Sequence, residues 1–229
     1  MTFPTAIRRL VSGTAATLLL AGCAQHVAER AASVPPTPSA PSAPPSAPCG
    51  AIATRPGRAG MIVAAPGGPA DVRTDQIAAE IARRTGFGLV VEDVRPACGG
   101  YEQRVREVAQ GPLRFYAEIY GTNQRESASR IEIATVGVDR EYAARLRTLA
   151  ELIRDAYLRG HAGAPRLDVL VAPADTVRGD AARRDGILRL PERALQIELP
   201  RVARIEFREL YTAILSDFLA QAVTLPVGR

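Results

Sequence analysis

The sequence predicts an α/β protein with three layers, in which helices cover both faces of a central mixed sheet. Two observations carry this prediction. Short apolar runs bounded by turn residues alternate along the chain with longer segments whose apolar residues recur at helical spacing. Strands that alternate with helices are typical of a sheet covered on both faces. The expected class is therefore α/β, with one domain over residues 49–229.

The individual elements follow from these two patterns. Six short apolar runs are expected to be strands, and they cover residues 61–65, 88–92, 113–119, 130–136, 167–171 and 195–199. Three segments carry apolar residues on one helical face, namely 71–85, 139–159 and 204–222. The first two of these end beside glycines, Gly86 and Gly160, which commonly stop a helix. The aromatic residues of the helices are expected in the core.

The beginning of the chain has the pattern of a bacterial lipoprotein signal. Arg8 and Arg9 precede a short apolar stretch, which ends in Leu20-Ala21-Gly22-Cys23. The stretch is shorter than the roughly 20 residues that a membrane-spanning helix needs. We therefore expect residues 1–22 to be removed and Cys23 to carry lipid such as palmitate. The protein would then be anchored outside the cytoplasm in the cell envelope, and Ala24 favours the outer membrane.

Residues 23–48 are rich in Pro, Ser and Ala, which predicts an extended spacer between the lipid and the domain. The two other cysteines, Cys49 and Cys98, form an even pair in an oxidising compartment, which favours a disulfide over two buried thiols. All 29 basic residues are Arg, so Schiff-base chemistry is excluded. Because these arginines are scattered among acidic residues, the basic charge does not predict nucleic-acid binding.

Five segments carry a resemblance to a known family. They cover residues 62–68, 74–86, 115–123, 130–137 and 194–201, and they read IVAAPGG, TDQIAAEIARRTG, FYAEIYGTN, RIEIATVG and ALQIELPR. Their order and spacing resemble N-formylglutamate amidohydrolase-like proteins, which are relatives of the zinc carboxypeptidases. The resemblance covers most of residues 60–222 and implies a phosphorylase/hydrolase-like sheet, an amidase or peptidase activity and a zinc ion.

The chain departs from this family at the residues that bind the metal. The family carries zinc-binding histidines at the positions that Gly67, Tyr120 and Gln196 occupy here. Catalytic zinc takes three protein ligands and a water. Glycine offers no ligand, and a tyrosine hydroxyl with a pKa near 10 is a poor one. We therefore expect no zinc and no other cofactor.

A polar site remains at the ends of the predicted strands. Glu198 matches the carboxylate that relatives use as a general base, although a strand-end carboxylate paired with Arg201 is an equal alternative. Asn123, Arg125, Arg130 and Arg201 follow or end strands, where α/β proteins bind ligands. Arg130 equally suits a surface pair with Glu126.

These observations predict a catalytically degenerate amidohydrolase-like domain that acts by binding. The expected ligand is a peptide, a γ-glutamyl or amino-acid carboxylate, or a partner protein of the envelope. Two alternatives remain open. One is an active amidase with a rebuilt site that uses Glu198 as the base. The other is a structural envelope lipoprotein in which Tyr120 and Gln196 fill the cleft.

The lipid anchor is tested by changing the acylated cysteine. In Cys23→Ser the precursor is expected to stay uncleaved and unlipidated, because the lipobox offers no other thiol. Metabolic labelling with a fatty acid and membrane fractionation measure both effects. Normal processing and membrane association of the variant would contradict the lipoprotein assignment.

Overall fold

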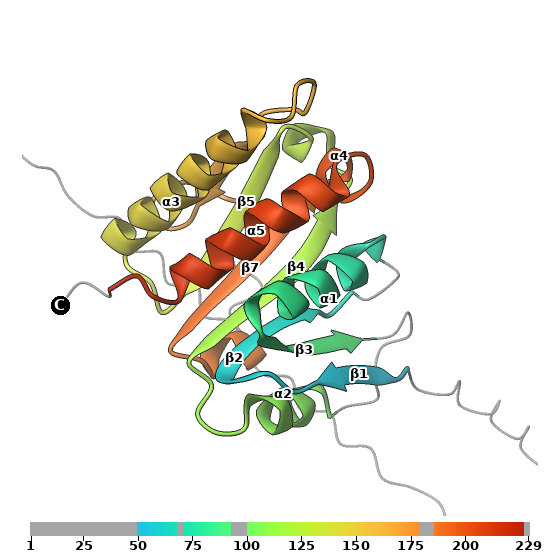
Figure 1. The fold of residues 1–229 in the computed structure, drawn as a ribbon. Helices are drawn as coiled ribbons and strands as arrows, with labels where there is room; N and C mark the ends of the chain where they lie inside the picture. The colour runs from blue at the N-terminus through green and yellow to red at the C-terminus, as the bar shows by residue number, and fades with distance from the viewer. Residues whose placement is uncertain (1–49, 68–70, 93–99, 179–185, 227–229) are drawn as a thin grey trace, which may run out of the picture. The chain divides into compact units, whose positions relative to one another are not determined.

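The computed structural model describes residues 50–67, 71–92, 100–178 and 186–226. Within these ranges the chain forms a seven-stranded sheet in the order β1-β3-β2-β4-β7-β5-β6 (Figure 1). Strands β3, β2, β4 and β7 run parallel to one another. Strand β1 is antiparallel to β3, and β5 is antiparallel to β7 and parallel to β6. The predicted mixed sheet is confirmed.

All six predicted strands are present at slightly shifted bounds, and one edge strand, β1, was not predicted. The strands are β1 (Ile52–Arg55), β2 (Arg58–Ala65), β3 (Phe87–Glu92), β4 (Phe115–Thr122), β5 (Arg130–Val136), β6 (Asp168–Val171) and β7 (Arg193–Pro200). The α-helices are α1 (Thr74–Thr85), α2 (Tyr101–Ala109), α3 (Arg140–Leu158), α4 (Arg201–Arg204) and α5 (Arg208–Ala222). Helix α2 was also not predicted.

Helices cover the two faces of the sheet unequally. Successive side chains of a strand point to opposite faces, so each strand feeds two cores. In β2, Val63 packs in a large core with α1, α3 and α5, whereas Ile62 and Ala64 pack in a smaller core with α2. The rings of Phe87 and Phe115 meet edge to face in the large core, with centroids 6.0 Å apart. The side of the sheet that α2 covers is called the α2 face below.

Helix α5 lies between α1 and α3 (Figure 1), which explains its sequence. Because neighbours contact it on two sides and the sheet lies beneath it, α5 is apolar around most of its circumference. The predicted single helix over residues 204–222 is wrong at its beginning. Helix α4 ends at Arg204, and the backbone of Phe207 is not helical, with φ −117° and ψ 32°. This break places Arg204 in a helix separate from α5.

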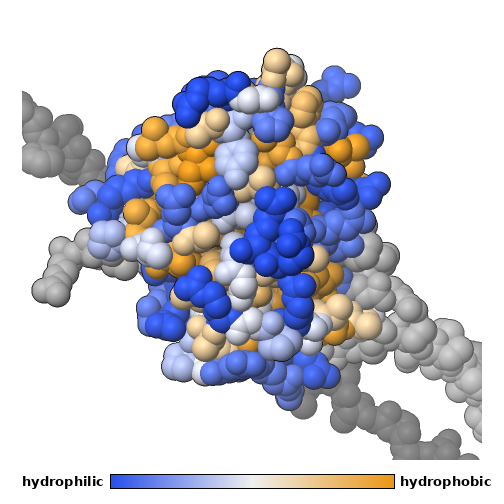
Figure 2. Space-filling model, viewed as in Figure 1, coloured by the Kyte–Doolittle hydropathy of each residue, from blue (hydrophilic) through white to orange (hydrophobic). Residues whose placement is uncertain are grey.

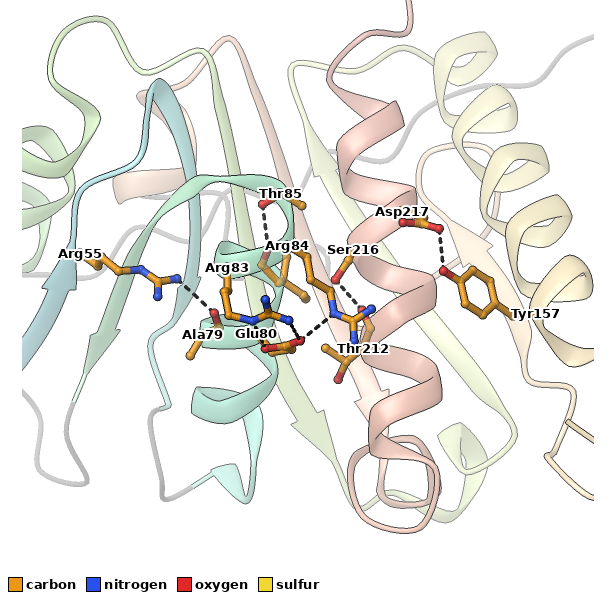
Figure 3. A network of polar contacts seen from close by, with 11 residues as sticks. Arg55, Ala79, Glu80, Arg83, Arg84, Thr85, Tyr157, Thr212, Ser216 and Asp217 are labelled. Atoms are coloured by element: carbon orange, nitrogen blue, oxygen red, sulfur yellow. Dashed lines mark hydrogen bonds and ion pairs between the residues drawn. The ribbon is translucent and has the colours of Figure 1, made fainter. Parts of the chain in front are cut away.

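Hydrogen bonds lie within α1 and between α3 and α5 on the large-core side (Figure 3). Glu80 of α1 accepts from Arg83 and Arg84 at 2.6 to 2.7 Å. The hydroxyl of Tyr157 on α3 donates to Asp217 on α5 at 2.7 Å. In the part of the chain described, no helix combines the length and the apolar character needed to cross a membrane.

The leader, the spacer and all three cysteines lie outside the described residues. The expectations for Cys23, for the bridge between Cys49 and Cys98, and for residues 1–48 therefore stay predictions.

The network at Glu80 predicts a small dependence of stability on pH. Hydrogen bonds from Arg83 and then Arg84 lower the pKa of Glu80 from 4.5 to about 2. A pKa lowered by folding stabilises the folded state above pH 4.5, and this gain is lost as the pH falls toward 2. Glu80→Gln should therefore lower the free energy of unfolding at neutral pH by less than about 1 kcal/mol, because the pair is partly exposed.

Urea denaturation at several pH values measures this difference, which should vanish toward pH 2. Glu192→Gln is the matched control, because Glu192 is exposed and its side chain has no hydrogen bond to any described residue. An equal loss in both variants, or a difference independent of pH, would contradict the assigned cause.

Candidate functional site

The carboxyl ends of β2, β4 and β7 meet at one edge of the sheet, because the three strands are parallel. This edge is where α/β proteins commonly bind ligands. Gly67 follows the end of β2, while Tyr120 and Gln196 lie on the neighbouring strands β4 and β7. In the register of these strands Tyr120 is opposite Glu198, and Gln196 is opposite Glu118. The three positions that the sequence analysis singled out therefore lie on, or shortly after, neighbouring strands of the sheet.

The α2 face carries a band of polar side chains at this edge. Gln196 is buried, and its Nε2 donates to Oε1 of Glu198 at 3.3 Å. Glu118 is also buried and accepts from the hydroxyl of Tyr116 at 3.0 Å. Tyr116 in turn lies 3.0 Å from the hydroxyl of Tyr101 on α2. Burial raises the pKa of both tyrosines well above the ordinary value, so both phenols stay protonated at neutral pH.

A third carboxylate, Glu132, lies directly opposite Glu198 on the antiparallel strand β5. Its two oxygens accept from the hydroxyl of Ser127 at 3.0 Å and from the backbone N–H of Arg178 at 2.9 Å. Nε of Arg130 lies 3.8 Å away. Because like charges that face each other across strands are destabilising, these donors and the arginine offset the repulsion. Sequence reasoning missed Glu118 and Glu132, although alternate polar residues in the predicted strands were a usable signal.

The opposite face of the same edge is closed by a buried arginine. Arg204 is 2% exposed, and all five of its N–H groups have acceptors in three chain segments. The acceptors are the carbonyls of Leu199 (3.1 Å), Asp71 (3.3 Å), Val72 (2.9 Å) and Thr122 (3.2 Å), and Oδ1 of Asn123 (3.0 Å). Arg204 therefore joins the end of β7, the end of β4 and the turn before α1.

Asp71 completes this arrangement, which is called the Arg204 clamp below. Its Oδ1 lies 3.8 Å from Nη1 of Arg204, and its Oδ2 accepts from the backbone N–H of Gly121 at 2.5 Å. Burial lowers the pKa of Arg204 from its ordinary value and the charge of Arg201 adds to this, while Asp71 opposes the shift. A β-carbon at position 121 would lie 2.3 Å from Cζ of Arg204, so only glycine fits beside the clamp.

The predicted binding residues fall into two groups. Oδ1 of Asn123 is already an acceptor for Arg204, and Arg130 lies beside Glu132. Arg125 and Arg201 are exposed, and neither pairs with an acidic side chain in the described ranges. Because Thr122 is in register with Pro200, the segments that follow β4 and β7 begin side by side. Arg125 and Arg201 are called the rim arginines below.

Among the described residues, the structure has neither of the two ion pairs that the sequence suggested, Glu126 with Arg130 and Glu198 with Arg201. Glu126 does not pair with Arg130; its Oε2 lies 3.4 Å from Nη1 of Arg178 instead. Glu198 accepts from Gln196, and no contact between Glu198 and Arg201 is observed among the described side chains.

The residues at this edge do not fit a catalytic zinc ion. A β-carbon at position 67 would lie 2.8 Å from the β-carbon of Asp71, so the space for a side chain there is already taken. The carboxylate of Asp71 is held by Gly121 and Arg204, and Gln196 presents an N–H donor to Glu198. Within the described ranges, no three His, Cys, Asp or Glu side chains are grouped to hold a metal.

The seven-stranded mixed sheet and its covering helices define an α/β protein. No protein-family model matches the sequence, and no curated protein matches it. Among solved structures the chain is similar to a bacteriophage poly-γ-glutamate hydrolase, with a TM-score of 0.53 and 13% identity over 77% of this chain and 88% of that one. This likeness shows the fold, and it confirms the predicted fold class.

Two further structures are similar at lower TM-scores. An N-acetylmuramoyl-L-alanine amidase of Nostoc punctiforme has a TM-score of 0.36 and 15% identity, over 73% of this chain and 97% of that one. A metallo-carboxypeptidase from Burkholderia cenocepacia has a TM-score of 0.43 and 10% identity, over 77% of this chain and 65% of that one.

The Arg204 clamp predicts a large loss of stability when the guanidinium is removed. Arg204→Met leaves five acceptors without donors and Asp71 without a cation, which should lower the free energy of unfolding by about 3–5 kcal/mol. Gly121→Ala should also be destabilising, because its new methyl group enters the same space. Guanidinium chloride or urea denaturation measures both losses.

Arg106→Met is the control, because Arg106 is an exposed helix residue and such changes usually stay within about 0.5 kcal/mol. A loss at Arg204 no larger than that at Arg106 would show that the clamp does not hold these segments.

Proposed function

We propose that this protein is a lipid-anchored envelope protein whose amidase-like domain binds a carboxylate-bearing ligand and does not hydrolyse it. The observation that carries the proposal is the pair of rim arginines at the carboxyl edge of the sheet. Both are exposed, and both lack an acidic partner in the described part of the chain. A guanidinium presents two parallel N–H groups that match a carboxylate, so this pair suits an acidic ligand.

The absence of hydrolysis is inferred from the chemistry of the donors. Gly67, Tyr120 and Gln196 supply no imidazole, and Asp71 is held by the Arg204 clamp. Without a Lewis acid, no group at this edge lowers the pKa of an attacking water toward 7. Glu198 alone would contribute only the modest acceleration of a general base.

The ligand class is narrowed by chemistry and by compartment. The lipobox and the spacer favour a position outside the cytoplasm, where envelope peptides and amino-acid polymers are found. The similar bacteriophage protein acts, by its name, on poly-γ-glutamate, a polymer with one free carboxylate per residue. Two arginines suit a ligand with two carboxylates, such as a γ-glutamyl peptide.

The proposal predicts that the full-length protein binds γ-L-glutamyl-L-glutamate without cleaving it. Arg125→Ala and Arg201→Ala should each weaken binding about tenfold, because a hydrogen bond to a charged group contributes about 1.5–3 kcal/mol and these side chains are exposed. Isothermal titration calorimetry measures the affinity, and chromatography of the incubated peptide measures cleavage. Arg106→Ala removes an exposed arginine that is not one of the rim arginines and serves as the control.

Two results would contradict the proposal. Unchanged affinity in both rim variants would place the ligand elsewhere. Cleavage of the peptide that is lost in Glu198→Gln would instead support the alternative of an active amidase, since Glu198 is the carboxylate that the band of polar side chains presents.

A further inference from the structure

A hollow lies along the line where α1 and α5 run side by side, and its end at Arg73 and Ile205 adjoins the Arg204 clamp. Figure 2 shows strongly hydrophilic side chains at the middle of this side of the molecule. Two adjoining hollows of about 360 and 400 Å³ share Arg208 and Glu209. Each is within the range of small-molecule sites. The first is lined by Arg73, His161, Ile205, Glu206, Phe207 and Leu210, and the second by Gln76, Glu80, Arg84 and Thr212. Together they are called the α1/α5 groove below.

Two guanidinium groups converge on one neutral atom in this groove. Nη1 of Arg73 donates to Oε1 of Gln76 at 3.0 Å, and Nη1 of Arg208 donates to the same oxygen. Neither arginine forms an ion pair with a described residue. Two like charges held close together without a counter-ion favour an anionic group between them.

Two carboxylates in the same groove are also unpaired. Glu206 and Glu209 are exposed, and neither forms a hydrogen bond or an ion pair through its side chain with any residue in the described ranges. Glu80 differs, because Arg83 and Arg84 already hold it. The groove therefore presents two free positive and two free negative groups, and these do not pair with each other.

The backbone conformation of Arg73 is strained. Its φ of 75° lies in the left-handed region, which a residue other than glycine adopts only with strain. Glycine would adopt this conformation without strain, yet it would remove the guanidinium. Ile205, Phe207 and Leu210 supply an apolar wall beside the charged groups. The nearby His161 is held through Nδ1 by the carbonyl of Tyr157 at 2.9 Å.

We propose that the α1/α5 groove binds a small zwitterion, namely a free amino acid or a short peptide with both termini unblocked. The carboxylate is held by Arg73 and Arg208 in place of Gln76, and the ammonium is held by Glu206 and Glu209. An apolar side chain of the ligand lies against Phe207. This site does not depend on the rim arginines or on the function proposed for them.

The experiment compares three probes that differ only at their ends. L-alanyl-L-alanine carries both charges, its N-acetyl derivative lacks the ammonium, and its C-terminal amide lacks the carboxylate. Calorimetry on the full-length protein should show binding of the parent dipeptide and at least about fivefold weaker binding of each derivative, since each loses one charge-assisted contact. Glu206→Gln with Glu209→Gln should weaken the parent dipeptide but leave the N-acetyl derivative unchanged.

Arg73→Gly is the decisive variant, because it removes one guanidinium while relieving the strain. Its melting temperature should equal or exceed that of the wild type, and its affinity for the dipeptide should fall about fivefold or more. Arg106→Gln serves as the surface control. Arg125→Ala and Arg201→Ala should leave dipeptide binding unchanged, which separates this proposal from the rim.

The proposal is overturned by three results at the groove and by a fourth at the rim. The results at the groove are no binding of the parent dipeptide, equal binding of the N-acetyl derivative, and undiminished binding by folded Arg73→Gly. Loss of dipeptide binding in the rim variants alone would assign the ligand to the carboxyl edge and equally overturn the groove.

Discussion

The guanidinium of Arg204 carries five N–H groups, and each one that leaves water needs an acceptor. The chain meets this requirement with four backbone carbonyls and one amide oxygen, drawn from the ends of β4 and β7 and from the turn before α1. These segments are far apart in sequence, since Arg204 and Asp71 are separated by 133 positions. One side chain therefore fixes the edge of the sheet where ligands commonly bind. Asp71 and Gly121 have their conformations set by the same contact.

The Arg204 clamp determines how much of this edge is open to a ligand. On the large-core side, Arg204 and Asp71 occupy the space and satisfy each other's charge. On the α2 face, Gln196 and Glu198 bond to each other and Glu132 is bound by its own donors. The rim arginines are left as charged groups without acidic partners in the described part of this edge. The fold is similar to that of a bacteriophage poly-γ-glutamate hydrolase, while the side chains of this edge do not fit a catalytic zinc ion.

Much of the fold followed from the sequence. Six strands were predicted because each is a short apolar run bounded by turn residues. This pattern is local in the sequence and does not depend on how the strands pair in the sheet. Strand β1 was not predicted because three of its four residues are exposed. Helix α2 was not predicted because it is short and mostly polar. The break between α4 and α5 was missed because Ile205 and Phe207 continue the apolar pattern across it.

The candidate site was predicted less completely. Asn123 and the rim arginines were singled out because they follow or end strands, and their binding roles stay predictions, although Asn123 accepts a hydrogen bond from Arg204. The sequence predicted Arg204 and Asp71 at the starts of two different helices. No residue near either one in the sequence indicates that the two side chains are in contact. A buried arginine is recognised only through its partners, which are distant in sequence. The carboxylates Glu118 and Glu132 lie within predicted strands, but their apposition to Gln196 and Glu198 depends on strand order.

The central claim is that side chains, and not a metal ion, organise the carboxyl edge. Anomalous diffraction at the zinc absorption edge, on crystals grown with excess zinc, tests it most directly. The account predicts no anomalous peak within coordination distance of Asp71, Tyr120, Gln196 or Glu198, and a guanidinium of Arg204 bonded to Leu199, Val72 and Thr122 in the density. A zinc peak at this edge, with Asp71 turned away from Arg204 to bind it, would contradict the account.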